Sequence, residues 1–500
     1  MTDTLVFEMP PAERPATLPY SFARRMGVLL RPGAAGPECL HRPDAALDAL
    51  LEVQRIAPAA TFVAAAPETF DAALGATYGS AASTAAADFD LESVDLATLA
   101  DSAAQVDDLL DSRDDSPVIR LINAILLEAI KEGASDVHVE TSERRLVVRF
   151  RIDGVLRDIV EPQRALAPLL VSRIKVMAKL DIAEKRVPQD GRVTLRIGGH
   201  DVDARVSTIP TQHGERVVMR LLERGSVRLD LGALGMSERD RDLFNRLLER
   251  PHGILLVTGP TGSGKTTTLY TALTRLNDRK RNVMTVEDPI EYELAGVAQT
   301  QVNPRTDMTF ARGLRAILRQ DPDVIMVGEI RDQETAQTAV RSAMTGHFVL
   351  STLHTNSAVG SVTRLIDMGV ERYLLAPMVV GLAAQRLVRK LCPACRREDV
   401  ATEADAILLG RAITPGEPLW RAEGCSECHG EGYRGRAALY EVVAVDDAFQ
   451  ALIHDGASEA ELERHARAAG NPALLDDGVM KVREGLTTAD EVARVVRDEA

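Results

Sequence analysis

Eight consecutive residues carry the strongest chemical signal in the sequence. They read Gly259-Pro260-Thr261-Gly262-Ser263-Gly264-Lys265-Thr266, and Thr267 follows directly. The glycines let backbone N–H groups turn inward around phosphate groups, because no side chain obstructs them. Lys265 is placed to reach the β- and γ-phosphates, and the Thr266 hydroxyl to ligate Mg²⁺. The pattern therefore predicts a P-loop that binds ATP and Mg²⁺.

Two groups of acidic residues follow the P-loop along the chain. The first contains Glu287, Asp288 and Glu291, and the second is Glu329 after the apolar run 324–327. Phosphoryl transfer needs an acid near the metal and a group that orients water. Glu329 could hold the Mg²⁺ shell, directly or through water. A single acid at the end of a strand is often only solvated, but two such groups favour a catalytic site.

Two histidines bracket another apolar run, Phe348 to Thr352. His347 precedes this run and His354 follows it. They could sense the γ-phosphate or link neighbouring strands. A purely structural role fits their spacing equally well.

Five cysteines are present, and four of them form two C-x-x-C pairs. The pairs are Cys392 with Cys395 and Cys425 with Cys428. Each pair offers two thiolates on one turn, and two such turns complete a tetrahedron around a structural Zn²⁺. The alternative is four reduced thiols without metal. Cys39 has no partner in sequence and is predicted to be a buried or surface thiol.

The P-loop lies in a region whose pattern is α/β. The run 254–257 before it predicts a strand, and Thr266 to Leu276 after it predicts a helix. Further short apolar strands are predicted at 282–286, 324–327 and 348–352, with helical stretches between them. This order predicts a mostly parallel sheet with helices on both faces, whose ligands bind at the carboxyl ends of the strands.

An α+β region precedes the α/β region. A helix is predicted to begin at Ser116-Pro117, and a second helix covers 166–179. A hairpin is predicted over 146–156 with Asp153-Gly154 as its turn. Strands at 192–197 and 201–207 are joined at Gly198-Gly199.

The length of 500 residues predicts several domains. Residues 1–80 form a small N-terminal domain and 116–228 the α+β domain. The segment 81–115 is rich in Asp and is interpreted as a flexible tether without chemistry. Residues 229–500 form the ATPase domain, with the zinc subdomain at about 390–436 and a helical tail after Tyr440.

The overall charge of −15 argues against nucleic acid as the main partner, because phosphate neutralisation needs clustered Lys and Arg. No run of about 18 apolar residues that could span a bilayer is found. The N-terminus has no apolar core typical of a signal peptide. We therefore expect a cytoplasmic chain that contacts the membrane only peripherally, through partners.

Beyond the P-loop, several segments resemble the secretion ATPases of the type II/type IV pilus group. The matching segments are 285–291, 310–323, 321–332, 345–356 and 384–392. Within the group the chain resembles the GspE family, and the resemblance covers about residue 115 to the end and more loosely the N-terminal region. It implies a RecA-like ATPase domain preceded by a PAS-like domain, working as a homohexamer.

The resemblance also implies roles for individual residues. Glu291 becomes the general base that orients the attacking water, Glu329 the Walker B acid, and His347 and His354 the histidine box. Arginines resembling those that reach the nucleotide phosphates are Arg205, Arg216 and Arg220, with Arg315, Arg319, Arg331 and Arg436 as weaker candidates. A permanently charged guanidinium suits that task. Surface ion pairs are the alternative role for each arginine.

The implied function is to power type II secretion. ATP hydrolysis would move the two domains about a hinge near 224–231 and drive pseudopilus assembly through a GspF-like inner-membrane platform. The N-terminal domain would bind the cytoplasmic part of a GspL-like inner-membrane protein. A type IV pilus extension ATPase, a nucleic-acid motor on the same core and a scaffold that binds ATP without turnover are the alternatives.

Overall fold

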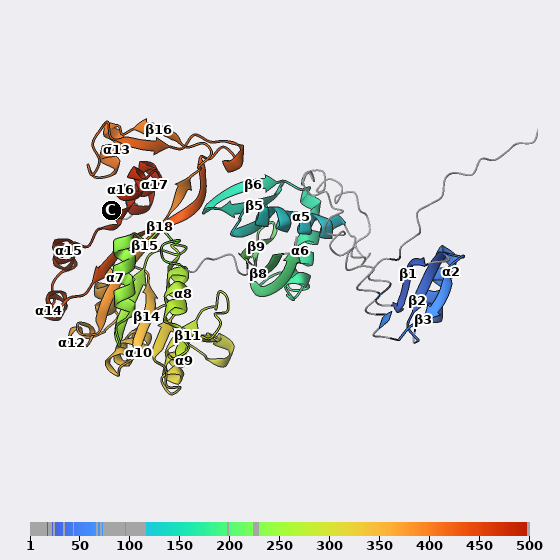
Figure 1. Cartoon of the computed structure of the whole chain (residues 1–500), viewed down its shortest axis with the longest axis horizontal. Helices are drawn as coiled ribbons and strands as arrows, with labels where there is room; N and C mark the ends of the chain where they lie inside the picture. Colours follow the sequence, from blue (N-terminus) through green and yellow to red (C-terminus); the bar gives the residue numbers. More distant parts are fainter. Residues whose placement is uncertain are drawn as a thin grey trace, which may run out of the picture. The chain divides into compact units, whose positions relative to one another are not determined.

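The computed structural model (Figure 1) divides into two compact units, 1–121 and 122–500. It describes residues 18, 23, 26–33, 36–43, 45–66, 69, 70, 73, 96, 117–197, 200–223 and 230–497. Most of the predicted acidic tether at 81–115, the Gly198-Gly199 turn and most of the predicted hinge at 224–231 lie outside the described residues. The predicted domain boundaries stay predictions.

The first unit contains a small three-stranded sheet. Its elements are β1 (Val28–Gly33), β2 (Gly36–His41), α2 (Leu47–Ile56) and β3 (Thr61–Ala64). β1 and β2 are antiparallel, whereas β2 and β3 are parallel and are connected through α2. Cys39 is fully buried in the core of this unit, and burial raises the pKa of its thiol to about 11. Of the two locations predicted for this cysteine the buried one is confirmed, and a thiol of this kind is unreactive.

The second unit begins with a six-stranded antiparallel sheet in the order β6-β5-β4-β9-β8-β7. The helix α5 (Pro117–Lys131) spans the boundary between the units, and the further elements are β4 (Asp136–Thr141), β5 (Leu146–Ile152), β6 (Val155–Val160), η1 (Arg164–Leu166), α6 (Ala167–Met177), β7 (Gln189–Ile197), β8 (His200–Thr211) and β9 (Gly214–Glu223). The predicted hairpin is confirmed, with Asp153 and Gly154 both at positive φ in its turn.

The P-loop belongs to a seven-stranded sheet in the order β12-β11-β13-β14-β10-β15-β18. Its strands are β10 (Gly253–Thr258), β11 (Val283–Glu287), β12 (Ala298–Gln301), β13 (Val324–Val327), β14 (Phe348–Leu353), β15 (Val379–Leu391) and β18 (Tyr433–Ala444). The first six run parallel, and β18 pairs antiparallel with β15. The predicted mostly parallel sheet is confirmed.

Helices cover both faces of this sheet (Figure 1). They are α7 (Glu238–Leu248), α8 (Lys265–Leu276), α9 (Phe310–Ile317), α10 (Gln333–Met344), α11 (Gly360–Asp367) and α12 (Arg372–Leu375), and the exposed turn η2 (Pro304–Thr306) precedes α9. All six residues of β10 are buried. Ile254 and Leu256 pack with residues of α9 and α10, whereas Leu255 and Val257 pack with residues of α7 and α8. Alternate side chains of a strand point to opposite faces, so β10 joins the two cores.

The C-terminal part follows the long pair β15 and β18. It contains β16 (Arg397–Val400), α13 (Glu403–Leu408), β17 (Pro418–Arg421), η3 (Ser426–Cys428), α14 (Asp447–Asp455), α15 (Glu459–Ala468), α16 (Leu474–Arg483) and α17 (Ala489–Arg497). The predicted helical tail is confirmed, although β18 continues to Ala444 before it begins. No helix within the described ranges is long and apolar enough to cross a membrane.

Candidate active site and metal centre

The P-loop connects the buried strand β10 to α8 at the carboxyl edge of the parallel sheet. Lys265 is the first residue of α8, and Thr266 and Thr267 follow it in the first turn. The helix N-terminus presents free backbone N–H groups and the positive end of the helix dipole to this edge. The predicted strand and helix around the motif are both confirmed, and their arrangement suits an anion.

Two glycines of the loop are required by the close approach of β15. Gly259 has φ 148°, and a Cβ there would lie 2.4 Å from the Gln385 carbonyl oxygen. Gly264 has φ 89°, and a Cβ there would lie 2.8 Å from the Gln385 side-chain nitrogen. The Thr268 hydroxyl also donates to the Gln385 side-chain oxygen at 2.8 Å. The loop therefore packs directly against Gln385 of β15, and only glycine fits at these two positions.

In this conformation the P-loop itself supplies hydrogen-bond acceptors to the Lys265 ammonium. Its Nζ donates to the carbonyl oxygens of Gly259 at 2.6 Å and Pro260 at 2.9 Å. Burial lowers the pKa of Lys265 to about 8, Glu329 opposes that shift and Arg386 adds to it. Because the hydrogen bonds that the described residues accept from this buried ammonium go to neutral carbonyls, it can exchange them for an anionic phosphate.

Glu329 lies just past the end of β13, where strand order predicts a ligand site. Its carboxylate pairs with Arg331 and lies 3.6 Å from His354 Nε2. Burial lowers the pKa of His354, and the charge of Lys265 contributes in the same direction. The structure thus brings three of the predicted residues, Lys265, Glu329 and His354, to one edge of the sheet.

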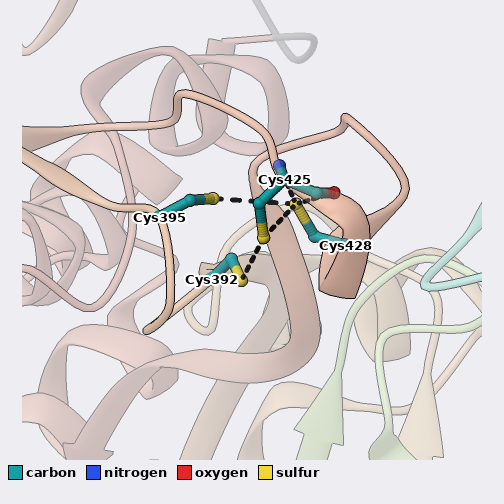
Figure 2. Close-up of side chains that lie close together, drawn as sticks. All are labelled: Cys392, Cys395, Cys425 and Cys428. Carbon is teal, nitrogen blue, oxygen red and sulfur yellow. Dashed lines mark hydrogen bonds between the residues drawn. The ribbon is translucent and has the colours of Figure 1, made fainter.

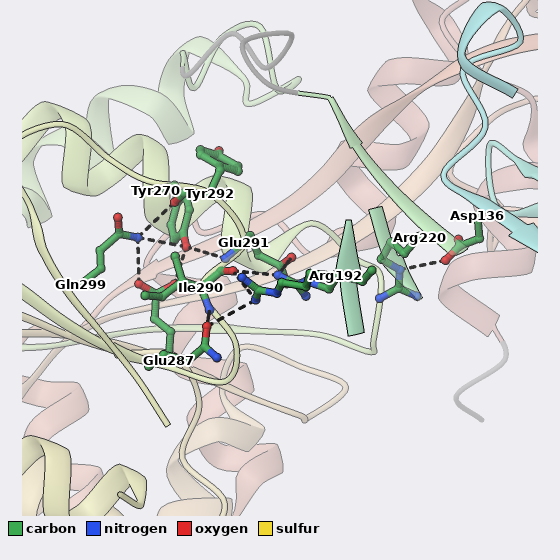
Figure 3. A network of polar contacts seen from close by, with 11 residues as sticks. Asp136, Arg192, Arg220, Tyr270, Glu287, Ile290, Glu291, Tyr292 and Gln299 are labelled. Carbon is green, nitrogen blue, oxygen red and sulfur yellow. Dashed lines mark hydrogen bonds and ion pairs between the residues drawn. The ribbon is translucent and has the colours of Figure 1, made fainter. Parts of the chain in front are cut away.

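The acidic segment after β11 is organised by buried hydrogen bonds (Figure 3). Glu287 is buried and accepts from the Tyr270 hydroxyl, from Thr285 Oγ1 at 2.5 Å and from Gln299 Nε2 at 3.1 Å. Burial raises the pKa of Tyr270, and the neighbouring charge of Glu287 adds to that rise. Glu287 is therefore a structural anchor, while Glu291 remains partly exposed.

Glu291 is contacted by an arginine of the antiparallel sheet. Arg205 Nη2 lies 2.8 Å from Glu291 Oε2 and also donates to the Ile290 carbonyl oxygen at 2.8 Å. Arg192 reaches the same carbonyl at 3.3 Å. One of the three predicted phosphate arginines, Arg205, thus meets the predicted base directly.

A cavity of about 950 Å³ opens beside the P-loop. Its lining includes residues 260–263 of the loop and several arginines from both sheets and the tail, namely Arg151, Arg220, Arg386, Arg389, Arg436 and Arg494. Arg220 is paired with Asp136 at 2.8 Å, as Figure 3 shows, and Arg436 lies 3.6 Å from Asp153. The volume suits a nucleotide, and the arginines suit its phosphates.

Arg386 was missed by reasoning from the sequence. It is buried on β15, where Nη2 donates to the Asn356 carbonyl oxygen at 2.8 Å. Its Nη1 lies 3.1 Å from the position that a Cβ on Gly259 would occupy. It therefore joins the P-loop to the loop after His354. Its only sequence signal was its place in segment 384–392, whose resemblance to the secretion ATPases is specific.

Other predicted residues lie away from this edge. His347 is at the amino end of β14 and bonds to the Ser342 carbonyl oxygen at 2.8 Å. β14 has six residues, so its two ends are about 20 Å apart. The structure therefore does not bring His347 to Lys265 within one chain.

Three further arginines are held by local partners. Arg216 pairs with Glu140 at 2.6 Å, Arg315 pairs with Glu334, and Arg319 donates to the Arg315 carbonyl oxygen at 2.9 Å. In one chain Arg216 and Arg315 match the alternative of surface ion pairs, and Arg319 bonds to a backbone carbonyl rather than to a phosphate site.

The four paired cysteines converge as predicted (Figure 2). All four Sγ atoms lie within 4.8 Å of one another, and the Cys395–Cys428 and Cys425–Cys428 separations are both 3.7 Å. A tetrahedron with Zn–S bonds of about 2.3 Å has edges of about 3.8 Å, so the geometry fits zinc.

Backbone amides support the thiolate form of Cys428, whereas burial raises the pKa of its neighbour Cys395 to about 12. Burial opposes ionisation of Cys428, but N–H groups of Cys425 and Gly432, at 3.2 and 3.1 Å from its Sγ, lower its pKa to about 6. The four cysteine thiolates would occupy all four coordination positions of a tetrahedral ion, so none is left for water or substrate. The cluster therefore suits a structural zinc rather than a catalytic one.

Comparison with known families matches nearly the whole chain. Residues 111–494 match the family described as Type II/IV secretion system protein. Residues 17–78 match the family that describes an N-terminal domain of GSPII protein E.

Similar proteins extend over the full length. Type II secretion system protein E of Pseudomonas aeruginosa is 59% identical and is aligned over 98% of both chains. Type II secretion system ATPase E of Vibrio cholerae is 53% identical, also over 98% of both chains.

Solved structures show a similar fold. The Legionella pneumophila ATPase DotB superposes with a TM-score of 0.57 at 21% identity, covering 76% of this chain and 96% of its own. The pilus retraction motor PilT with bound ADP superposes with a TM-score of 0.53 at 27% identity, covering 75% and 96%. The predicted RecA-like fold is thereby confirmed.

Proposed function

The chain belongs to the Type II/IV secretion system protein family, and from that membership we propose that it hydrolyses ATP to power type II secretion. One observation carries this function: Lys265, Glu329 and the loop of Glu291 all stand at the carboxyl edge of one parallel sheet. That edge is where nucleotides bind in this architecture.

ATP binding would draw Lys265 away from the carbonyl groups of its own loop. Its ammonium would then contact the β- and γ-phosphates, with backbone N–H groups of residues 262–266 cradling them. Thr266 and Glu329 would hold Mg²⁺, whose charge neutralises the phosphates during transfer. The short separation between Glu329 and His354 supports a role in which the imidazole would respond to the γ-phosphate.

Glu291 would act as the general base that orients the attacking water. Arg205 would move between Glu291 and the γ-phosphate, so that the α+β domain responds to the state of the nucleotide. Arg220 and Arg436 would approach the phosphates from the wall of the cavity. The remaining candidates, His347, Arg216, Arg315 and Arg319, would reach a nucleotide only from a neighbouring subunit of a homohexamer.

The N-terminal match supports a proposal about partners. Residues 17–78 match the N-terminal domain family of GSPII protein E, and we propose that this domain binds the cytoplasmic part of a GspL-like inner-membrane protein. The ATPase domain would act on a GspF-like platform and drive pseudopilus assembly. This arrangement gives a cytoplasmic chain attached peripherally to the inner membrane, with no nucleic acid involved.

The tetracysteine cluster would hold a structural Zn²⁺ in the C-terminal part. The sulfur separations near 3.7 Å and the amide donors to Cys428 support this assignment. Zinc there would stiffen the segment that connects β15 to β18.

A pilus extension ATPase is not favoured, because full-length relatives at 51% identity or more carry type II secretion names. The direct test adds purified partners to the purified full chain. We expect ATP turnover to rise when the cytoplasmic domain of the inner-membrane partner is added and to stay unchanged when DNA is added. Stimulation by DNA alone would contradict the secretion function.

A further inference from the structure

A single buried hydroxyl connects the P-loop helix to the loop of the proposed base. Tyr270 is fully buried on α8, and its hydroxyl contacts Glu287, the backbone nitrogen of Glu291 at 3.2 Å and Gln299 Nε2 at 3.3 Å. Figure 3 shows these side chains gathered around the ring. The hydroxyl has one proton. It donates this proton to the Glu287 carboxylate, and so it accepts from the Glu291 N–H and from Gln299.

The position of Tyr270 on the helix matters as much as its contacts. Lys265 begins α8 and Tyr270 follows five residues later, which corresponds to a rise of about 7.5 Å along a rigid helix. The same helix thus carries the phosphate-binding lysine and the group that holds the Glu291 backbone. Their separation is fixed by helix geometry rather than by a flexible loop.

The other contacts of the Glu291 loop come from residues outside the P-loop helix. Its side chain pairs with Arg205 of the antiparallel sheet. Gln299 holds the loop further on, donating to the Tyr292 carbonyl oxygen at 3.2 Å and accepting from the Leu294 N–H at 2.7 Å. Among the hydrogen bonds of the described residues, only the one from the Glu291 N–H to the Tyr270 hydroxyl connects the backbone of Glu291 to the P-loop helix.

We propose that Tyr270 is a positioning residue that holds Glu291 at a fixed distance from the P-loop through its hydroxyl. This inference rests on the proposed function, because it assumes that Glu291 is the base. The Tyr270 hydroxyl contacts Glu287, Gln299 and the Glu291 backbone, so its role is positioning rather than catalytic. It acts by orienting the carboxylate when Arg205 releases it.

The neighbouring residue offers a matched control. Tyr292 packs edge-on against Tyr270, with ring centroids 4.8 Å apart. Its hydroxyl oxygen is buried but has no hydrogen-bond partner among the residues that the structure describes. Tyr270→Phe and Tyr292→Phe therefore remove the same atom from the same cluster, and only the first removes bonds to the base loop.

The experiment measures kcat, KM and the Kd for ATP of the full-length variants, with Glu291→Gln measured in parallel. For Tyr270→Phe we expect kcat to fall about tenfold, as for loss of a positioning hydrogen bond to a catalytic group, with Kd for ATP unchanged. Tyr292→Phe should keep the wild-type kcat. Thermal melting checks that both variants are folded.

Several outcomes overturn the proposal. These are an unchanged kcat in Tyr270→Phe, equal losses in the two phenylalanine variants, and a loss in Tyr270→Phe that is matched by weaker ATP binding. Unaltered turnover in Glu291→Gln would instead overturn the proposed base itself. The two failures are therefore distinguishable.

Discussion

Arg205 and Glu291 form an ion pair, with 2.8 Å between Nη2 and Oε2, although Arg205 lies on β8 of the antiparallel sheet and Glu291 in the loop after β11. In this conformation the carboxylate that would activate water is occupied by the guanidinium that would stabilise phosphate. Both groups must separate from each other before they act on ATP. The pair therefore offers a physical link between the α+β sheet and the chemistry of the P-loop.

Replacing this arginine tests the link. Arg205→Ala should lower ATP turnover about 10²- to 10³-fold, as expected when one preorganised donor to a transition state is lost. Arg192→Ala is the control, because the hydrogen bonds of Arg192 within the described part of the chain go to the Ile290 carbonyl oxygen and to Gln301 and not to Glu291. Steady-state phosphate release measures both. Equal activity of Arg205→Ala and wild type would contradict a role at the phosphate.

ATP affinity should depend on pH through Lys265. The pKa of this lysine in the free protein is about 8, below its usual value, so the ammonium is charged below pH 8 and becomes neutral above it. Phosphates bind the charged form, so ATP affinity should fall as pH rises through 8, approaching about tenfold per pH unit. Lys265→Gln should bind weakly without this dependence. Titrating a fluorescent ATP analogue from pH 7 to 10 measures the effect, and a flat wild-type profile would contradict it.

Close packing at Gly259 predicts a strong effect of a single methyl group. Gly259→Ala would place a Cβ 2.4 Å from the Gln385 carbonyl oxygen, so the loop must shift and ATP binding should be lost. Gly470→Ala also adds a Cβ at a positive φ, 82°, but no atom lies within 4 Å of that Cβ. It should bind ATP normally and lose only about 1 kcal/mol of stability. Calorimetric titration with ATP compares the two variants. Normal binding by Gly259→Ala would contradict the close packing of the P-loop against Gln385.

Metal removal should affect the C-terminal part. We expect one zinc per chain in the purified protein, which Cys395→Ser should lose while Cys39→Ser retains it. Binding energy at a structural zinc site is folding energy, so the C-terminal segment should melt at lower temperature in Cys395→Ser. Metal analysis and scanning calorimetry provide the measurements. A wild-type chain that purifies and folds without zinc would contradict the assignment.

The sequence predicted local elements better than long-range contacts. The P-loop, the strand at 324–327 and the cysteine pairs have short spacings, so their structure is set by neighbouring residues. β15 and β18 were not predicted as strands, because their apolar runs have no alternation and are buried on both faces. Their pairing joins residues far apart in the chain.

The same limit applies to the site. Lys265 and Glu329 follow strands of one parallel sheet, so motif order was enough to bring them to one edge. The Arg205–Glu291 pair, the Tyr270 hydroxyl and the buried Arg386 depend on side-chain packing between distant segments. Spacing placed both histidines beside one strand, but it did not show that His347 stands at the opposite end from His354.

The most direct test of the account separates ATP binding from hydrolysis in Glu291→Gln. Forced hexamers of this variant and of wild type are compared for the Kd of ATP and for phosphate release. We predict an unchanged Kd and turnover reduced by about 10²- to 10⁴-fold, as expected when a general base is lost. Wild-type turnover in Glu291→Gln would contradict the assignment of this carboxylate as the base.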